Sequence, residues 1–147
     1  MTWLIPPRLV LMLCIIMAVF TYFVPIRTLF VWPWQLLGLI LCLVGVAMVF
    51  AITKRFSRVE TEINTFKTPL KLQTDGLFGI SRNPIYLGML IFLIGVAITC
   101  GCLAAWTGPI VFFLFANHWY IPVEETNAEA SFGAPYLEYK TRVQRWL

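Results

Sequence analysis

The sequence has few charged residues and few residues of the types that carry acid–base or metal chemistry. Only 12% of its 147 residues are Asp, Glu, Lys or Arg, and it contains one histidine and four cysteines. In contrast, 60% of the residues are hydrophobic and the mean hydropathy is +0.82. A chain of this size cannot bury so much apolar surface inside a water-soluble globule. The composition therefore excludes an ordinary soluble domain and favours the bilayer as solvent, with helices as the spanning elements.

The cysteines and the histidine do not form a metal-binding pattern. Cys14 and Cys42 lie within apolar runs, and Cys100 and Cys102 make a lone C-x-C without a second pair. His118 is distant along the chain, whereas zinc sites combine closely spaced pairs. We expect no metal site and no disulfide framework. Nothing in the sequence suggests a P-loop, a G-x-G-x-x-G fingerprint or a Ser-His-Asp set.

Four long apolar runs are the main positive feature of the sequence. They cover about 9–24, 34–53, 85–100 and 103–121. Each approaches the roughly 20 residues needed to cross a bilayer, and tryptophans near the run ends fit an aromatic belt. The first run lacks the small-residue cleavage site of a signal peptide. We predict an all-α integral membrane protein, a single domain over residues 1–147 with four transmembrane helices.

The charged residues predict the orientation of this bundle. Every lysine and arginine except Arg27 lies before the first run, between the second and third runs, or after the fourth. All seven acidic residues share these segments. The positive-inside rule then predicts cytoplasmic N- and C-termini, with polar cytoplasmic segments at 54–83 and 122–147. Because the basic residues are spread over two segments without a recognition fold, we expect no nucleic-acid partner.

The stretch SRNPIYLG, residues 81–88, joins a polar tripeptide to the third run. Asn83 suits a helix N-cap and Pro84 the first helical position, so helix initiation and topology account for each residue singly. Together with Arg82, however, the free N–H groups of a helix start form a corner that suits a carboxylate or phosphate. Tyr86 would lie in the first turn, with space beside it left by Gly88.

Two small-residue pairs predict close helix contacts. Gly38 and Gly45 share a face of the second run, and Gly88 and Gly95 share a face of the third. Small residues at such spacing let helix backbones approach each other in lipid. Bundle packing is the simpler interpretation of these glycines.

The pair Glu124-Glu125 follows the fourth run, which we expect Pro122 to end or kink. Two carboxylates at the membrane edge are costly, and such groups are often functional. They could favour a helix start, bind a cation, accept from ribose hydroxyls or position a nucleophile. His118 lies on the same run and is either a packing group or part of the site.

The C-terminal stretch FGAPYLEYKTRVQRWL predicts a further helix. Gly133 suits the end of one helix and Pro135 the start of the next. An apolar stripe recurs at helical spacing, at Tyr136, Tyr139, Val143 and Trp146. This pattern is typical of an amphipathic helix on the inner leaflet. Arg142 or Arg145 is placed to close a site.

In this order, LQTDGLFGISRNPIYLG, EE and FGAPYLEYKTRVQRWL resemble the isoprenylcysteine carboxyl methyltransferase family and its relatives among phospholipid methyltransferases. The resemblance covers about 72–147 and implies a membrane enzyme that uses S-adenosyl-L-methionine, with a pocket facing the cytoplasm. Asn83 stands where the family often has histidine; it can hydrogen-bond but cannot titrate. The resemblance implies cofactor contacts from Thr74, Gly76, Phe78, Arg82, Asn83, Tyr86, Gly88, Glu124 and Glu125. We assign catalytic roles to Glu124 and Arg142, and a substrate-binding role to His118.

Several functions are compatible with these motifs. The expected reaction is methyl transfer to a lipidic or apolar acceptor that enters from the bilayer, most like isoprenylcysteine carboxyl O-methylation. A phospholipid amine or a small thiol is an alternative acceptor. From other classes, an NADPH-dependent sterol-type reductase resembles this family in its C-terminal half, and a non-catalytic membrane scaffold would use every motif as a cap, a topology charge or a belt.

Overall fold

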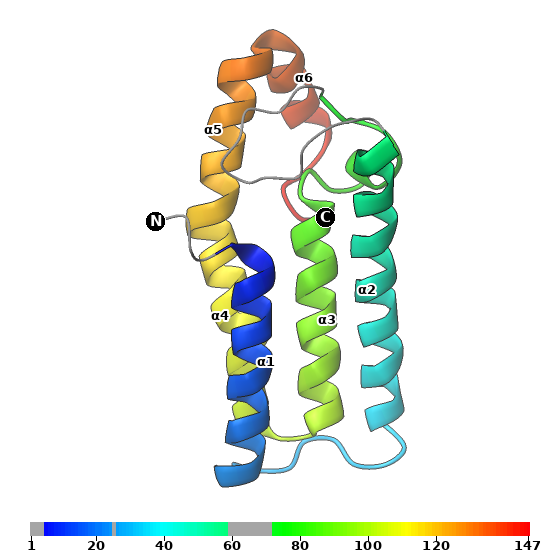
Figure 1. Cartoon of the computed structure of the whole chain (residues 1–147), viewed down its shortest axis with the longest axis vertical. Coiled ribbons are helices and arrows are strands. Elements are labelled where there is room, and N and C mark those ends of the chain that lie inside the picture. Colours follow the sequence, from blue (N-terminus) through cyan, green and yellow to red (C-terminus); the bar gives the residue numbers. More distant parts are fainter. Residues whose placement is uncertain (1–4, 25, 59–71) are drawn as a thin grey trace.

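The computed structural model describes residues 5–24, 26–58 and 72–147, and for residues 56–58 the backbone alone. These residues fold into helices packed as an antiparallel bundle, without a named strand in the described ranges (Figure 1). This confirms the predicted all-α fold. The elements in chain order are α1 (Pro6–Phe23), α2 (Gln35–Arg58), the 3-10 helix η1 (Gly76–Gly79), α3 (Pro84–Cys100), the 3-10 helix η2 (Leu103–Trp106), α4 (Thr107–Phe115), the π-helical segment η3 (Ala116–Tyr120), α5 (Ile121–Phe132) and α6 (Ala134–Arg142).

One end of the bundle is closed by its two short connections. Gly101 ends α3 in the left-handed conformation, with φ of 72°, and its carbonyl accepts a hydrogen bond of 2.7 Å from the Leu29 amide. An isolated antiparallel bridge joins Thr28 to Cys102 beside it. The described parts of both polar segments, 54–83 and 122–147, lie at the opposite end (Figure 1). Residues 59–71, with two of the basic residues used to predict orientation, lie outside the described ranges.

The α2–α3 interface is built on glycine, as the spacing predicted. A Cβ on Gly95 would lie 2.6 Å from the Gly38 carbonyl oxygen and from the Cys42 amide nitrogen. One on Gly45 would lie 2.5 Å from the Gly88 carbonyl oxygen. The two backbones are therefore in direct contact, and side chains at these positions would force them apart.

The remaining helices pack around a buried apolar core. Met17 of α1 and Phe112 of α4 are fully buried, and Leu93 of α3 lies in the same cluster. Gly108 allows α1 to pack closely against α4, because a Cβ at this position would lie 2.1 Å from the Met17 sulfur. The outer surface is also apolar: Leu43 is 71% exposed and Phe50 is 67% exposed. Such a surface suits lipid rather than water.

The helix lengths support part of the predicted membrane topology. In the described ranges, two helical stretches are long and apolar enough to cross a bilayer, Pro6–Phe23 and Gln35–Arg55. Pro84–Cys100 is apolar but shorter. The fourth predicted run, 103–121, is not one regular α-helix, since it contains η2, α4 and η3 before α5 begins.

Pro122 does not end the fourth run, so of the two outcomes expected there, an end or a kink, the end was wrong. The chain passes from α4 through η3 directly into α5, which continues to Phe132 (Figure 1). A π turn widens the helix by one residue and rearranges the local hydrogen bonds. Because η3 comes just before Pro122, the proline lies in the first turn of α5, where a missing N–H is tolerated.

The C-terminal helix begins where the sequence indicated, but its apolar face has a different neighbour. Gly133, with φ of 57°, separates α5 from α6, and Pro135 lies in the first turn of α6. Tyr136 and Tyr139 are 5% and 3% exposed, so they are buried in the protein. The tyrosine face of α6 therefore packs inward, whereas we expected it to lie on the leaflet.

Candidate functional site

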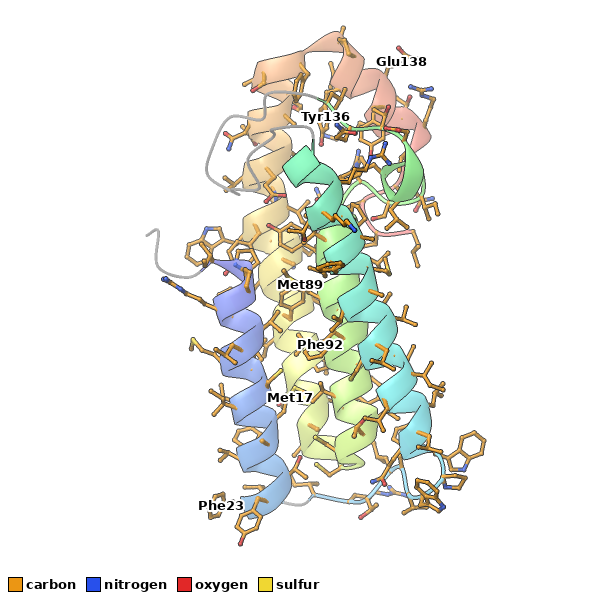
Figure 2. All side chains as sticks on the ribbon, turned by 45° about the vertical axis from the view of Figure 1, so that its right-hand side comes forward. Met17, Phe23, Met89, Phe92, Tyr136 and Glu138 are labelled. Atoms are coloured by element: carbon orange, nitrogen blue, oxygen red, sulfur yellow. The ribbon has the colours of Figure 1, made fainter. Side chains whose placement is uncertain are left out.

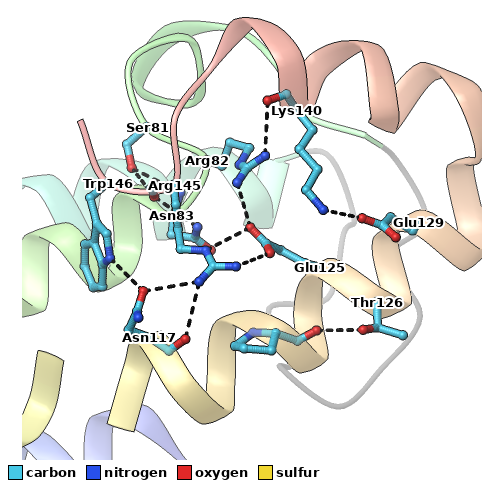
Figure 3. A network of polar contacts seen from close by, with 11 residues as sticks. Ser81, Arg82, Asn83, Asn117, Glu125, Thr126, Glu129, Lys140, Arg145 and Trp146 are labelled. Atoms are coloured by element: carbon cyan, nitrogen blue, oxygen red, sulfur yellow. Dashed lines mark hydrogen bonds and ion pairs between the residues drawn. The ribbon is translucent and has the colours of Figure 1, made fainter. Parts of the chain in front are cut away.

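Three segments distant in sequence converge at the polar end of the bundle. The first is 81–83, immediately before α3; the second is the η3–α5 region; and the third is the C-terminal tail after α6 (Figure 3). Each contributes polar side chains that contact the other two. The sequence brings them together because α3 and α4 are antiparallel, so the start of α3 lies beside the end of the fourth run.

Glu125 is at the centre of this cluster. Its Oε1 accepts hydrogen bonds from Arg82 at 2.9 Å and from the Arg145 Nε at 3.2 Å. Its Oε2 accepts from the second Arg145 guanidinium nitrogen at 2.6 Å (Figure 3). The side chains of Arg82 and Glu125 are 9% and 8% exposed, and that of Arg145 is 32% exposed. Charge-assisted pairs with this bidentate geometry are strong when desolvated.

The cluster carries one more positive than negative charge. Two guanidinium groups share a single carboxylate, Glu125. Backbone carbonyls satisfy part of the excess, because Lys140 accepts from Arg82 at 3.3 Å and Asn117 accepts from Arg145. The buried Nε of Arg82 has no hydrogen-bond partner among the described residues. A buried, underpaired cation is costly, so the site favours an additional anion.

The C-terminal tail is fastened to the start of α3. The Arg82 amide donates to the Gln144 carbonyl at 2.9 Å, and the Arg145 carbonyl accepts from the side chains of Ser81 and Asn83 at 3.2 and 3.1 Å. Asn83 does occupy the N-cap position before Pro84, but its side chain makes no capping hydrogen bond. It binds the tail instead. Asn83 is therefore a structural hydrogen-bond donor in this arrangement.

Tyr86 and Glu124 form a second polar pair beside the first. The Tyr86 hydroxyl donates to Glu124 Oε1 at 2.7 Å. The tyrosine ring is 4% exposed and stacks on Tyr120, with centroids 6.0 Å apart and an angle of 10° between the planes. The half-buried Glu124 carboxylate is thus held at the edge of the core by an aromatic pair.

Tyr136 and Tyr139 of α6 are buried near Arg82. The Tyr139 hydroxyl donates to the Phe78 carbonyl at 2.6 Å and so ties α6 to η1. Burial raises the pKa of both Tyr136 and Tyr139 to about 12. The Glu125 carboxylate also raises the pKa of Tyr136, while the Arg82 guanidinium opposes both shifts. Both phenols therefore remain protonated at neutral pH.

The structure brings five of the predicted site residues together and places the others elsewhere. Those brought together are Arg82, Asn83, Tyr86, Glu124 and Glu125, with the Phe78 carbonyl at the edge. Thr74, just before η1, and Gly76, its first residue, are both exposed. Gly88 is buried against α2, where a Cβ would lie 3.0 Å from Val49.

Arg142 and His118, which we expected to belong to the site, lie outside the cluster. Arg142 is exposed and lies 3.6 Å from Glu138 on its own helix. Arg145, which lies beyond the end of α6, provides the cation that reaches Glu125. His118 is exposed on η3 and does not join the described hydrogen-bond network.

Asn117 is the main site residue that the sequence interpretation missed. Its Oδ1 accepts from Arg145 at 3.2 Å and from the Trp146 indole at 3.3 Å, so it anchors the tail (Figure 3). A signal was present: Asn117 is a polar residue inside an apolar run, about two turns before Glu124. We assigned a site role to the neighbouring polar residue, His118, instead of Asn117.

Comparison with known proteins identifies related sequences. The model of the phospholipid methyltransferase family matches residues 34–134. An uncharacterized Haemophilus influenzae protein is 41% identical over 63 residues, which are 43% of this chain and all of that protein. Protein-S-isoprenylcysteine O-methyltransferase B of Arabidopsis thaliana is 36% identical over 74 residues, 50% of this chain. The matched part is 37% of the Arabidopsis protein. No solved structure matches.

Proposed function

The chain belongs to the phospholipid methyltransferase family, and on this premise we propose that it is a membrane methyltransferase that uses S-adenosyl-L-methionine. The proposed cofactor site is the cluster of Arg82, Glu125 and Arg145 together with the adjacent Tyr86–Glu124 pair. The family match includes all of these residues except Arg145, which lies in the tail.

The observation that carries this proposal is the pairing of two arginines, Arg82 and Arg145, with the single carboxylate of Glu125. S-adenosyl-L-methionine has a carboxylate, and a carboxylate is the kind of group that two arginines sharing one glutamate would bind. The unpartnered Arg82 Nε supplies a donor for it. The start of α3 adds the positive end of a helix dipole beside Arg82.

The two glutamates then take different roles. Glu125 is fully engaged by two arginines, so it orients them and is a positioning residue. Glu124 is half-buried and accepts a hydrogen bond from the Tyr86 hydroxyl, and a carboxylate is the kind of group that an ammonium or a ribose hydroxyl would bind. The contribution of these residues is binding, orientation and exclusion of water.

When bound, S-adenosyl-L-methionine would supply a methyl group from its sulfonium to an acceptor nucleophile aligned in line, and its sulfur would become a neutral thioether. Such a displacement requires alignment more than a strong base when the nucleophile is a carboxylate or thiolate. The absence of a titratable group at Asn83 is compatible with this chemistry. We further propose a lipidic or apolar acceptor, most like an isoprenylcysteine carboxylate, with a phospholipid amine or small thiol as alternatives, and an active site that faces the cytoplasm.

Cofactor binding by the full chain in detergent tests the proposal. We expect S-adenosylhomocysteine to raise the Tm of the purified protein and to bind with a measurable Kd. Arg82→Gln removes the excess charge but leaves Glu125 paired with Arg145, so the fold should persist. Loss of one charged hydrogen bond, about 1.5–3 kcal/mol, should weaken binding by about 10- to 100-fold.

Arg142→Gln is the matched control, because it removes an exposed arginine of the same segment. We expect its Kd to equal that of the unmodified protein. A protein that is stabilised by NADPH but not by S-adenosylhomocysteine would contradict the proposal and favour a reductase. Equal Kd values for Arg82→Gln and Arg142→Gln would remove the cluster from the cofactor site.

A further inference from the structure

At the end of the bundle opposite the polar cluster, the two connections contain a single charged residue, Arg27. It is exposed in the α1–α2 connection and forms no ion pair with any described residue. The acidic residues whose positions the structure describes belong to segments at the other end (Figure 1). The guanidinium therefore has no counter-ion within the described parts of the chain, and a partner that neutralises it has to come from outside.

The backbone of Arg27 is strained. Its φ is 42°, in the left-handed region that glycine adopts freely and that other residues enter at a cost. The Leu103 amide holds it there by donating to the Ile26 and Arg27 carbonyls, both at 3.1 Å. The bridge from Thr28 to Cys102 fixes the next residue. Residues kept in such conformations are concentrated at functional sites. A glycine would fit this backbone without strain, so the presence of arginine indicates a contact made by the side chain.

Four exposed aromatic side chains flank Arg27 along the chain. Tyr22 and Phe23 end α1, Trp32 and Trp34 precede α2, and each is at least 64% exposed. Figure 2 shows Phe23 at this end of the molecule. Tyrosine and tryptophan at the ends of apolar helices lie at the level of lipid head groups. Arg27 thus has the depth at which the phosphates of a bilayer would be found.

The chemistry of this surface favours a phospholipid with a net negative charge. A guanidinium binds phosphate oxygens through two parallel N–H donors. A zwitterionic head group would also bring an ammonium close to the guanidinium, and neither connection contains a carboxylate to offset that repulsion. A head group whose only charge is its phosphate, such as that of phosphatidylglycerol, therefore complements Arg27 best.

We propose that the α1–α2 connection binds an anionic phospholipid in the leaflet opposite the polar cluster, with the phosphate on Arg27 and the acyl chains against the exposed aromatic side chains. The lipid provides the counter-ion that this end lacks and fixes the depth of the bundle in that leaflet. The α3–α4 connection is held at the same depth, because the Leu103 amide is bonded to the Arg27 carbonyl. This lipid site is separate from the proposed cofactor site and does not depend on the reaction catalysed there.

Photo-crosslinking of the full chain in phosphatidylcholine nanodiscs tests the lipid site. The probes are phosphatidylglycerol and phosphatidylcholine with the same diazirine at the start of one acyl chain, so they differ only in the head group. We expect phosphatidylglycerol to label residues 26–34 about tenfold more than phosphatidylcholine, as one charged contact allows. Arg27→Gln should remove this preference, whereas Arg27→Lys, which keeps the charge, should retain part of it.

Arg142→Gln is the matched control, because it removes an exposed arginine at the opposite end of the bundle. It should leave the labelling of residues 26–34 unchanged. Equal labelling of these residues by the two probes, or a preference that persists in Arg27→Gln, would overturn the proposal.

The backbone strain gives a second readout that does not involve lipid. Arg27→Gly should lose the lipid preference as Arg27→Gln does, but its Tm in lipid-free detergent should be higher than that of Arg27→Gln by about 2–4 °C, because glycine adopts a positive φ without strain. A Tm no higher than that of Arg27→Gln would show that the conformation costs nothing, and would remove the reason to assign the arginine a ligand. These measurements need no cofactor, so their failure is separate from a failure of S-adenosylhomocysteine to bind.

Discussion

The α2–α3 interface and the cluster around Glu125 hold the same bundle together by opposite means. At the interface, backbones touch because glycine removes every intervening side chain, and no charge is involved. In the cluster, long side chains bridge segments distant in sequence, and the links to Glu125 are all charged. The α2–α3 interface depends on the lack of side chains at its glycines, and the cluster depends on ion pairs between two arginines and Glu125.

This difference shows where the molecule can change without unfolding. Close glycine contact has a single well-packed arrangement, so the interface is suited to a fixed scaffold. A charged cluster can exchange one partner for another when a ligand brings an anion. The polar end is therefore the part of the fold that can respond to binding.

Removing the central carboxylate should have the largest effect. Glu125→Ala leaves two arginines without their counter-charge in a largely buried position. We expect a loss of about 3–5 kcal/mol in the free energy of unfolding, measured by denaturant titration in detergent. Glu138→Ala, which breaks an exposed pair, should cost less than about 1 kcal/mol. Similar losses for the two variants would show that the cluster does not stabilise the fold.

A methyl group placed in the interface tests the opposite mechanism. Gly95→Ala puts a Cβ within 2.6 Å of two backbone atoms of α2, so the helices must separate. We expect a loss of about 1–3 kcal/mol, as for other overpacked sites, by the same titration. Gly79→Ala is the control, because the nearest atom would be 3.6 Å away. The loss should be independent of salt, whereas that of Glu125→Ala should change with salt.

Asn117, which binds the C-terminal tail, should contribute less to the free energy of unfolding than Glu125 or Gly95. Asn117→Ala removes the acceptor of Arg145 and Trp146, and we expect a loss of about 1–2 kcal/mol. Amide hydrogen exchange in 143–147 should rise with it. His118→Ala, at the adjacent exposed position, should change neither quantity. If exchange in the tail is unchanged by Asn117→Ala, the remaining links of the tail, to Ser81, Arg82, Asn83 and Glu125, are sufficient to hold it.

The smallest expected effect is that of Tyr136 on the stability of the fold at alkaline pH. Because burial raises the pKa of Tyr136 to about 12 from an ordinary value of 10.0, the folded state retains a proton that the unfolded chain loses. The stability is complete below pH 10 and falls as the pH rises toward 12. Tyr136→Phe should reduce this fall in Tm and leave the Tm at pH 8 nearly unchanged. Equal pH profiles would mean that Tyr136 ionises normally in the folded protein.

The sequence predicted the helices and the glycine interface because those features are local or periodic. Gly38 and Gly45, and Gly88 and Gly95, recur seven residues apart, which marks one face of each helix. The positions of the start of α3 at Pro84 and the break at Gly133 follow from single residues with strong conformational preferences. Such signals are visible without knowledge of the partner.

The interior of the site was harder to predict because its partners are remote in sequence. The motifs identified Arg82 and Glu125 but not that they bind each other across 43 positions. Two basic residues of the tail were equally plausible, and only the end of α6 at Arg142 determines that Arg145 turns inward. The continuation of the helix through Pro122 was not predicted, because a π turn has no clear signature in composition and removes the conflict that a proline normally creates.

The π turn also separates the rotational settings of the two helices that it joins. Each residue of an α-helix advances the side chains by about 100°, and a π turn inserts one residue into that count. The pattern of buried and exposed residues on α4 therefore does not fix the direction in which α5 presents its carboxylates. Deleting one residue from Ala116–Tyr120 would leave both helices intact but rotate Glu125 by about a quarter turn away from Arg82. One residue thus sets the angular register between the apolar helix α4 and the polar cluster around Glu125, and its gain or loss would alter the cluster without altering α4.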